Sequence, residues 1–483
     1  MFSDAFYENP LLAVKWLFML RDVRGGMGER RSFRICLAWL ANARPELVKK
    51  LIKLIPEYGR FDDLIYSGLE GELWELVVDE IDRQWEKDYK DMEDGKPISL
   101  LAKWMPSVNT SSPKTVAMAR KLAAKLGLTE RQYRKALSKM RAYLKVIEVK
   151  MSAKQWSEID YSAVPSQANI KYRGAFLRND ENRRREFLGA LEKGEAKINS
   201  STNFPSDIVH AYRSHVKYSG WGYNSCARIS CEKDIALEEL WKALPDYTKG
   251  LDTASTIVVD DGSGSMSVTV GNTLMTAHDV ADSLAIYFAE KLKGVFNNKY
   301  ITFSSSPKLV DMTQAKSLAE KIAIAAKHNE CSNTDIVAVF DLLLETAQQN
   351  NLKQEDIPAN VLIVSDMEFD QGTSWGGNNG YYCYWNGCDS KYKAQRNSLF
   401  AGIVKKWEAA GYKLPRIVFW NVNSRTKTVP MQSNELGVSL VSGFSPSIAK
   451  MVFSGKLDPF EVLVDALNAP RYDAVEKAVK DLV

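Results

Sequence analysis

The stretch TIVVDDGSGSM, residues 256–266, decides the fold of the second half of the chain. It begins with a run of mostly β-branched residues and changes abruptly to aspartate, glycine and serine. An apolar run of this length, bounded by turn residues, predicts a buried strand that ends in a tight loop. Asp261, Ser263 and Ser265 stand at alternate positions of that loop, so their side-chain oxygens can converge on a hard divalent cation. The alternative is a serine and glycine turn that binds no ligand.

Downstream of residue 256, short apolar runs alternate with helical segments. Strands are expected at 256–260, 300–304, 360–365, 416–421 and 438–441. Helices are expected at 273–292, 317–328, 336–348, 398–411 and 447–453. This alternation predicts a doubly wound, mostly parallel sheet that is covered on both faces. In such sheets, ligands bind beyond the carboxyl ends of the strands.

The first half of the chain has helical periodicity instead. Amphipathic segments with turns between them suggest helix pairs of about 40 residues, which is the spacing of HEAT repeats. The predicted fold class is therefore α + α/β, with a HEAT-like helical-repeat solenoid at 1–250 and an α/β domain at 251–483. An insertion rich in glycine and aromatic residues at 370–397 should lie at the ligand-bearing edge of the sheet. It is either a recognition surface or a loop that packs on its own domain.

Composition limits the classes of function. Hydrophobic residues make up 45% of the chain and charged residues 26%, as in ordinary globular proteins. No uninterrupted apolar run is long enough to cross a bilayer. The six cysteines are scattered, and two pairs have CxxxxC spacing, which is not the CxxC spacing of a zinc site. We therefore expect a cytoplasmic protein with reduced thiols.

Charge is distributed unevenly along the chain. Residues 101–150 contain 12 lysines and arginines and only two acidic residues, whereas residues 51–100 contain 6 basic and 14 acidic residues. Basic side chains interleaved with tyrosines are typical of surfaces that bind RNA, although a solvated helical face gives the same pattern. The RNA-binding candidates, chosen from charge alone, are Arg120, Lys121, Lys125, Arg131, Arg134, Lys135, Lys139, Arg141, Arg173 and Arg178.

A glycine-rich loop, RDVRGGMGERR at residues 21–31, is a second candidate for anion binding. Its glycines and arginines could hold a phosphate, with Arg24, Arg30 and Arg31 as the contacts. The loop matches no known phosphate-binding motif. The alternative is a connection between helices in which Asp22 and Glu29 pair with the arginines.

Three loops together resemble the metal-ion-dependent adhesion site of von Willebrand factor A domains. Asp261, Ser263 and Ser265 stand in the D-x-S-G-S-M motif of that family, Thr334 matches its single threonine and Asp366 its second-strand aspartate. The resemblance implies that the two serines and the threonine bind Mg²⁺, or another divalent cation, directly. The two aspartates would bind it directly or through water. Two carboxylates leave a coordination position for an anionic ligand from a partner.

The combination of a helical first half with this domain resembles the TROVE proteins, which include the Ro ribonucleoproteins, and a less characterised TROVE-like group. Five segments carry the resemblance: RDVRGGMGERR at 21–31, AKWMP at 102–106, residues 133–147, WSEIDYSAVP at 156–165, and residues 197–210. Ro proteins bind small noncoding RNAs and the ends of misfolded RNAs through their helical repeats. The resemblance therefore implies an RNA-binding protein that is not an enzyme.

Two other functions fit the sequence. In the first, the protein is an interaction scaffold whose metal captures an acidic side chain of a partner protein. In the second, it is a metal-dependent nuclease, which would need a general base beside the metal. Asp260, Asp335 and Glu368 are near the motif in sequence, but none has a fixed place there. Asp260 also departs from the adhesion-site pattern, which has an apolar residue before its first aspartate.

Overall fold

The computed structural model describes residues 1–213, 232–246, 256–270, 273–329, 334–366, 401–423, 438–442 and 459–483. The chain forms two compact units. We call residues 1–164, 172–189 and 463–483 the helical unit, and residues 165–171 and 190–462 the sheet unit. The predicted insertion at 370–397, Glu368 and both CxxxxC pairs lie outside the described residues.

The helical unit confirms the predicted helical character of the first half of the chain. Proline at the first position and a side-chain cap from the preceding residue define the beginnings of α2 and α9. Consecutive helices between residues 2 and 143 pack on one another through a continuous apolar core. Along the chain they are α1 (Phe2–Glu8), α2 (Pro10–Arg21), α3 (Arg31–Ala43), α4 (Pro45–Leu51), α5 (Ile55–Tyr58), α6 (Phe61–Tyr66), α7 (Gly71–Glu93), α8 (Leu101–Trp104), α9 (Pro113–Lys125), α10 (Glu130–Tyr143), α11 (Ile147–Ser152), α12 (Ser166–Asn179) and α13 (Glu181–Glu192).

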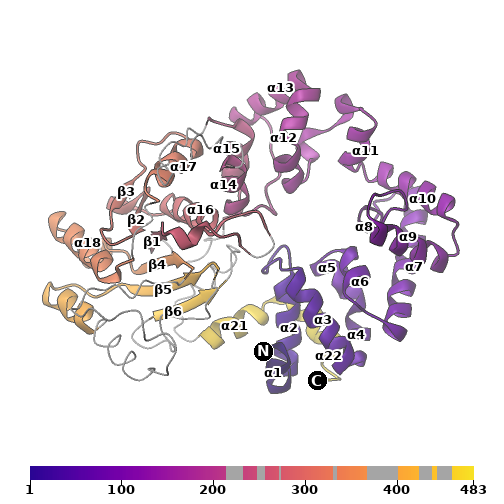
Figure 1. Ribbon diagram of the computed structural model, residues 1–483, viewed down its shortest axis with the longest axis horizontal. Coiled ribbons are helices and arrows are strands. Elements are labelled where there is room, and N and C mark those ends of the chain that lie inside the picture. The colour runs from indigo at the N-terminus through magenta and orange to yellow at the C-terminus, as the bar shows by residue number, and fades with distance from the viewer. Residues whose placement is uncertain are drawn as a thin grey trace. The chain divides into compact units, whose positions relative to one another are not determined.

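The C-terminal segment, residues 463–483, belongs to the helical unit. It contains the end of α21 (Pro459–Leu467) and all of α22 (Asp473–Val479), and α22 packs against α2 and α4 (Figure 1). Four of its side chains join the core of the unit: Leu467, Tyr472, Val475 and Val479. The structure thus divides the chain differently from the predicted domains 1–250 and 251–483.

Polar contacts also join this C-terminal segment to the first helices of the unit. Asp22, which is fully buried, accepts hydrogen bonds from Arg471 Nε at 2.9 Å and Nη2 at 3.0 Å. Lys15, also buried, donates to Glu476 at 2.7 Å and to Asn468 at 2.9 Å. Asp22 and Lys15, two buried charges near the N-terminus, therefore depend on partners more than 440 residues away in sequence.

The sheet unit contains a six-stranded sheet in the order β3-β2-β1-β4-β5-β6. All neighbouring strands are parallel except β2 and β3, which confirms the predicted, mostly parallel sheet. The short antiparallel edge strand β3 was not predicted. The strands are β1 (Thr256–Asp261), β2 (Lys299–Phe303), β3 (Leu309–Asp311), β4 (Asn360–Ser365), β5 (Arg416–Asn421) and β6 (Val438–Ser442).

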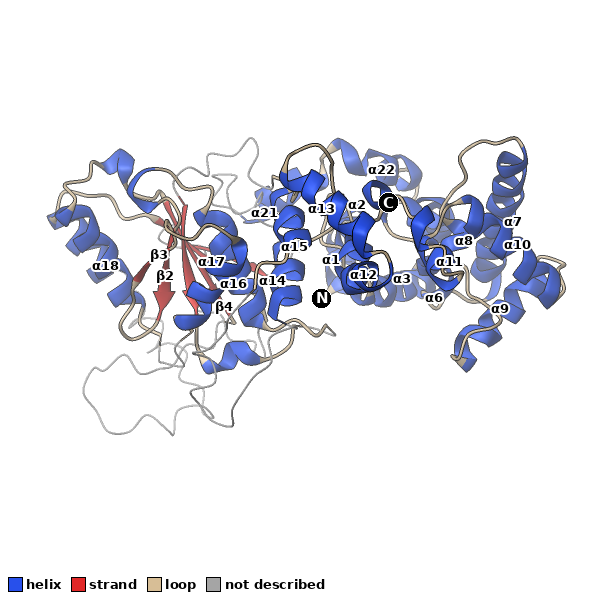
Figure 2. Ribbon diagram, turned by 90° about the horizontal axis from the view of Figure 1, so that it is seen from above, coloured by secondary structure: helices blue, strands red, loops and turns tan. Residues whose placement is uncertain are grey.

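Helices cover both faces of this sheet, as expected for a doubly wound fold. Because side chains alternate along a strand, Ile257 and Val259 face one layer and Val258 and Asp260 the other. The first layer contains α18 (Ile336–Gln349) and a helix at 401–409, whose Trp407 is fully buried. The second contains α16 (Ala277–Ala289). Figure 2 shows α16 and α18 on opposite sides of the strands.

Three more helices complete the described part of the sheet unit: α14 (Pro205–Arg213), α15 (Ile235–Lys242) and α17 (Leu318–Lys327). The first two precede residue 250, yet they pack with the sheet unit because α14 lies against α16. Glu238 of α15 accepts hydrogen bonds from the first backbone N–H groups of α17, at 2.8 and 3.1 Å. The predicted boundary at residue 250 therefore places α14 and α15 in the helical domain, whereas in the structure they belong to the sheet unit.

Candidate metal centre and basic helical surface

The candidate metal ligands lie at the carboxyl ends of three adjacent parallel strands. Asp261 ends β1, and Asp366 directly follows β4, the neighbour of β1 on one side. Thr334 is placed beside β2, the neighbour on the other side, because the next residue, Asp335, donates its backbone N–H to the carbonyl of Ser304 at 3.3 Å. The sheet order thus brings the three predicted loops to one edge.

The first loop is folded so that its oxygens lie close together. Asp261 Oδ1 accepts the backbone N–H of Ser263 at 2.9 Å, and the hydroxyls of Ser263 and Ser265 are 3.0 Å apart. Asp261 Oδ2 accepts the hydroxyl of Ser365, the last residue of β4, at 2.5 Å. Burial raises the pKa of Asp261 to about 6, hydrogen bonds from Ser365 and Ser263 oppose the rise, and the nearby charge of Asp366 adds to it.

The remaining donors fit a divalent cation. Asp366 is fully buried and Thr334 is 8% exposed. Among the described residues, Thr334 Oγ1 has no hydrogen-bond partner, although the atom is buried. A buried hydroxyl without a partner is costly, and a cation would satisfy it. The described residues contain no cluster of three or more His, Cys, Asp or Glu side chains suited to a metal, so this centre depends on its hydroxyls.

Two of the three candidate general bases are committed elsewhere. Asp335 caps α18, because its side chain accepts the backbone N–H groups of Val337 and Ala338 at 2.9 and 3.2 Å. Asp260 is buried and interacts with Asp282 of α16, on the opposite face of the sheet from Asp261. Its departure from the adhesion-site pattern is therefore explained by a polar neighbour behind the sheet.

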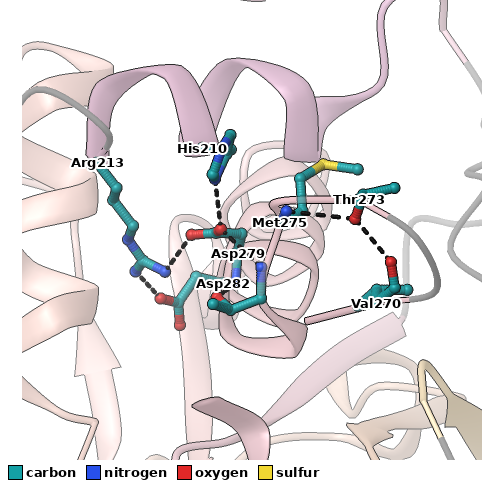
Figure 3. Close-up of polar contacts among 8 residues, drawn as sticks. His210, Arg213, Val270, Thr273, Met275, Asp279 and Asp282 are labelled. Carbon is teal, nitrogen blue, oxygen red and sulfur yellow. Dashed lines mark hydrogen bonds and ion pairs between the residues drawn. The ribbon is translucent and has the colours of Figure 1, made fainter. Parts of the chain in front are cut away.

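Asp260 belongs to a group that we call the buried charge cluster: His210, Arg213, Asp260, Asp279 and Asp282. Arg213 Nη1 donates to Asp279 at 3.0 Å, and its Nη2 pairs with Asp282 (Figure 3). His210 Nδ1 lies 2.8 Å from Asp279 Oδ2. The cluster joins α14 to α16 and to the strand that carries the candidate metal loop.

Ionisation within this cluster follows from burial and charge. Burial raises the pKa of Asp260 well above its usual value, and the neighbouring charge of Asp282 raises it further. Burial also acts on Asp282, but the charge of Arg213 outweighs it and lowers the pKa of Asp282. For Asp279, the hydrogen bond with His210 and the charge of Arg213 outweigh burial and lower the pKa to about 2.

Sequence reasoning missed the other four members of this cluster. A signal for two of them was present: Asp279 and Asp282 are three residues apart in an otherwise apolar helical segment, AHDVADSLAIYFA. Carboxylates on the core-facing side of a helix need a buried cation, and Arg213 is 66 residues from Asp279 and 69 from Asp282 in sequence. The need for a partner is therefore visible in the sequence, but the identity of the partner is not.

Helices α9 and α10 carry most of the residues predicted to bind RNA. Arg131, Arg134, Lys135 and Lys139 are exposed and share one side of α10; we call them the α10 basic face. Among the described residues, no carboxylate forms an ion pair with the first three of them, and Lys139 lies 3.9 Å from Glu93. These cations are therefore available to an external anion.

The cations of α9, unlike most of those on α10, interact with other side chains of the protein. Arg120 pairs with Glu130 at 2.9 Å, Lys125 with Glu75 at 2.6 Å, and Lys121 lies 4.1 Å from the centre of the Trp74 ring. All three side chains remain exposed, so they add positive charge to the surface. Surface pairs of this kind contribute little energy and can exchange partners.

Arg141 and Arg173 do not belong to this surface. Arg141 donates to the carbonyls of Ala102 at 2.8 Å and Met105 at 2.7 Å and to the Ser107 hydroxyl at 2.8 Å. It therefore fastens the end of α8 and the loop after it. Arg173 is only 9% exposed, whereas Arg178 of the same helix is exposed.

The glycine-rich loop at 21–31 caps α2. The backbone N–H groups of residues 26–29 bond back to carbonyls of residues 19–22, which occupies the donors that a phosphate would need. A Cβ on Gly26 would lie 2.0 Å from the Met19 carbonyl, so glycine is required there. Arg24, Arg30 and Arg31 are exposed and remain candidates for phosphate contacts through their side chains alone. Asp22 pairs with Arg471 instead of with the loop arginines.

Two domain-family models match successive parts of the chain. Residues 72–246 match a domain of unknown function, DUF2828, and residues 255–477 match another, DUF7788. The chain is 27% identical over 504 residues to the uncharacterized protein L728 of Acanthamoeba polyphaga mimivirus, covering 97% of this chain and 81% of L728. The crystal structure of the Deinococcus radiodurans RO (RSR) protein is similar with a TM-score of 0.47 and 14% identity, covering 96% of this chain and 92% of the other. None of the described helices has the length and apolar character to cross a membrane.

Proposed function

We propose that this protein binds RNA, small noncoding or misfolded, through its basic helices, and that its sheet unit holds a divalent cation that docks a ligand. The α10 basic face carries the first part of the proposal, because three adjacent cations there have no ion-pair partner among the described residues. Clustered cations without local partners give a polyanion a favourable, salt-dependent binding energy. The sequence resemblance to TROVE proteins supports RNA as that polyanion.

Charge reversal on α10 tests the RNA-binding part. The triple variant Arg131→Glu, Arg134→Glu, Lys135→Glu is expected to weaken binding to single-stranded RNA at least tenfold. The plot of log K against log salt should become shallower by about 2, because each lost phosphate contact in single strands contributes about 0.7 to the slope. Fluorescence anisotropy with a labelled RNA at several salt concentrations measures both quantities.

The matched control is Lys50→Glu, Lys53→Glu, Lys87→Glu, which changes three exposed lysines of the same unit and gives the same change in net charge. It should bind RNA within about twofold of the unchanged protein, since non-specific attraction decays with distance from the site. Equal losses in both variants would show that net charge, and no particular surface, governs binding. Absence of RNA binding by the unchanged protein would favour the scaffold alternative.

The metal centre is the second part of the proposal. Ser263, Ser265 and Thr334 would bind Mg²⁺ directly, and Asp261 and Asp366 directly or through water. Hard cations prefer such oxygen donors, and the ion would supply an open position for an anionic ligand. We propose docking and no catalysis, because the described candidates for a general base, Asp260 and Asp335, are committed to the buried charge cluster and to the α18 cap. In the scaffold alternative, the docked ligand is an acidic side chain of a partner protein.

Removal of one carboxylate tests the metal centre. Asp261→Ala is expected to weaken Mn²⁺ or Mg²⁺ binding at least tenfold in calorimetric titration. Asp260→Asn is the matched control, because this adjacent carboxyl group faces the other side of the sheet and interacts with Asp282 there. It should bind the cation as the unchanged protein does. A lack of cation binding by the unchanged protein at millimolar concentrations would overturn this assignment. RNA cleavage that needs both Mg²⁺ and Asp261 would revive the nuclease alternative.

A further inference from the structure

A groove of about 580 Å³ lies between α7 and α10 in the helical unit. Its lining includes two aromatic residues of α7, Trp85 and Tyr89, and two lysines of α10, Lys135 and Lys139. The lysines belong to the α10 basic face, so the groove opens directly beside the surface that we propose for RNA.

The aromatic side of this groove packs on the apolar core of the helical unit. Trp85 stacks on Tyr133, with ring centres 5.7 Å apart and planes 4° apart. Tyr133 is fully buried and donates its hydroxyl to the carbonyl of Pro106 at 2.9 Å. Tyr89 follows Trp85 by one helical turn and therefore lies on the same side of α7. It is half-buried, and Lys139 Nζ lies 5.0 Å from its ring centre. The Tyr89 ring thus packs partly against the core of the helical unit, and a face of it is reached by a positively charged side chain.

Charge differs between the two walls. The α7 wall contributes Glu86, Glu93 and Lys90, two carboxylates and one lysine with a net charge of −1, whereas the α10 wall contributes Lys135 and Lys139, with a net charge of +2. A phosphate group is attracted to the α10 wall and repelled by the carboxylates of the other wall. An uncharged aromatic group has no such penalty on the α7 side. The groove therefore suits a ligand with negative charge at one edge and a flat, neutral ring at the other.

We propose that the groove takes an unpaired base of single-stranded RNA, which stacks on Tyr89 while the neighbouring phosphates lie along Lys135 and Lys139. This inference rests on the proposed RNA binding and names the part of the surface that recognises a base. Aromatic platforms beside a basic track bind single strands in this way, because every base has a stacking face. The Lys139 side chain, which is long and exposed, moves from the ring to a phosphate when the base enters.

The test compares two substitutions of the same kind. Tyr89→Leu keeps an apolar side chain but removes the stacking face, and it is expected to weaken binding to a single-stranded RNA at least fivefold. The slope of log K against log salt should stay unchanged, because no phosphate contact is lost. Tyr7→Leu is the control, since Tyr7 is a tyrosine of the same unit that is 74% exposed and lies outside the groove. Binding of poly-glutamate, a polyanion without bases, should be equal in the Tyr89→Leu variant and the unchanged protein.

The outcomes separate this inference from the proposed function. If the unchanged protein binds RNA and the α10 charge reversal abolishes binding while Tyr89→Leu has no effect, RNA binding stands and the base site is wrong. If Tyr89→Leu weakens poly-glutamate and RNA equally, the groove binds polyanions or acidic peptides without reading a base. If the unchanged protein binds no RNA, both proposals fail. Crosslinking of a 4-thiouridine-containing RNA to the peptide that contains residues 85–93 would place the base directly.

Discussion

Deleting residues 463–483 is expected to unfold the helical unit or to lower its free energy of unfolding by roughly 6–12 kcal/mol, from four buried apolar side chains at about 1.5–3 kcal/mol each. That loss is comparable to the whole stability of a typical domain, about 5–15 kcal/mol. The deletion also removes the ion-pair partners of Asp22 and Lys15, which adds to the cost. Hydrogen exchange of the full chain and of the shortened chain, read over residues 10–69, measures the effect.

Two outcomes would contradict the role given to this segment. Unchanged protection of α2 and α4 after the deletion would show that the helical unit does not need it. A loss of protection confined to the sheet unit would place the segment with the other unit. Tyr472→Ala and Lys477→Ala provide a matched pair within the segment, since Tyr472 is buried and stacks on Tyr58 whereas Lys477 is exposed. Only the first should weaken α2.

Substitution of Arg213 by methionine is expected to destabilise the sheet unit by about 3–5 kcal/mol, the usual cost of removing one partner from a buried ion pair. Arg213 is 9% exposed, and methionine keeps much of its length while removing the charge that holds Asp279 and Asp282 ionised. We expect the midpoint of chemical denaturation to fall and the exchange protection of α14 and α16 to decrease together.

The double variant Arg213→Met, Asp282→Asn identifies the cause. Replacing the Asp282 carboxylate, which has lost its Arg213 partner, should recover part of the lost stability. An unpaired buried charge accounts for most of the destabilisation when one partner of a buried ion pair is removed. Lys406→Met is the surface control: its ion pair with Asp341 is largely exposed, and its loss should cost at most about 1 kcal/mol. Equal effects of Arg213→Met and Lys406→Met would show that the buried cluster contributes no more than a surface pair.

The sheet was predictable from local pattern because β1, β2, β4 and β5 are short runs of mostly apolar residues that are buried along most of their length. For β4 and β5, the expected ranges agree with the structure at both ends. The edge strand β3 was missed because it has only three residues, one of them exposed, which leaves no periodic signal. The unit boundary was missed for a different reason: nothing local in residues 463–483 shows that Arg471 pairs with Asp22.

The candidate metal loops were also readable, because motif and sheet topology together place Asp261 and Asp366 at neighbouring strand ends. The basic surface was readable only in part. Charge alone groups Arg141 with Arg134, yet the first binds carbonyls of its own unit and the second is exposed to solvent. The sequence does not distinguish an arginine that binds backbone carbonyls of its own unit from an arginine that is free for a ligand. Only the tertiary packing distinguishes them.

The position of residues 463–483 also determines when the helical unit can be completed during synthesis. On the ribosome, residues 1–164 emerge first, but the partners of Asp22 and Lys15 emerge only after the whole sheet unit has been translated. At about 5–20 residues per second, that interval lasts some tens of seconds. Throughout it, the nascent helices display a vacant apolar surface and two unmatched charges. We therefore expect ribosome-associated chaperones to bind the nascent chain at this surface until α22 has been synthesised and has packed onto it.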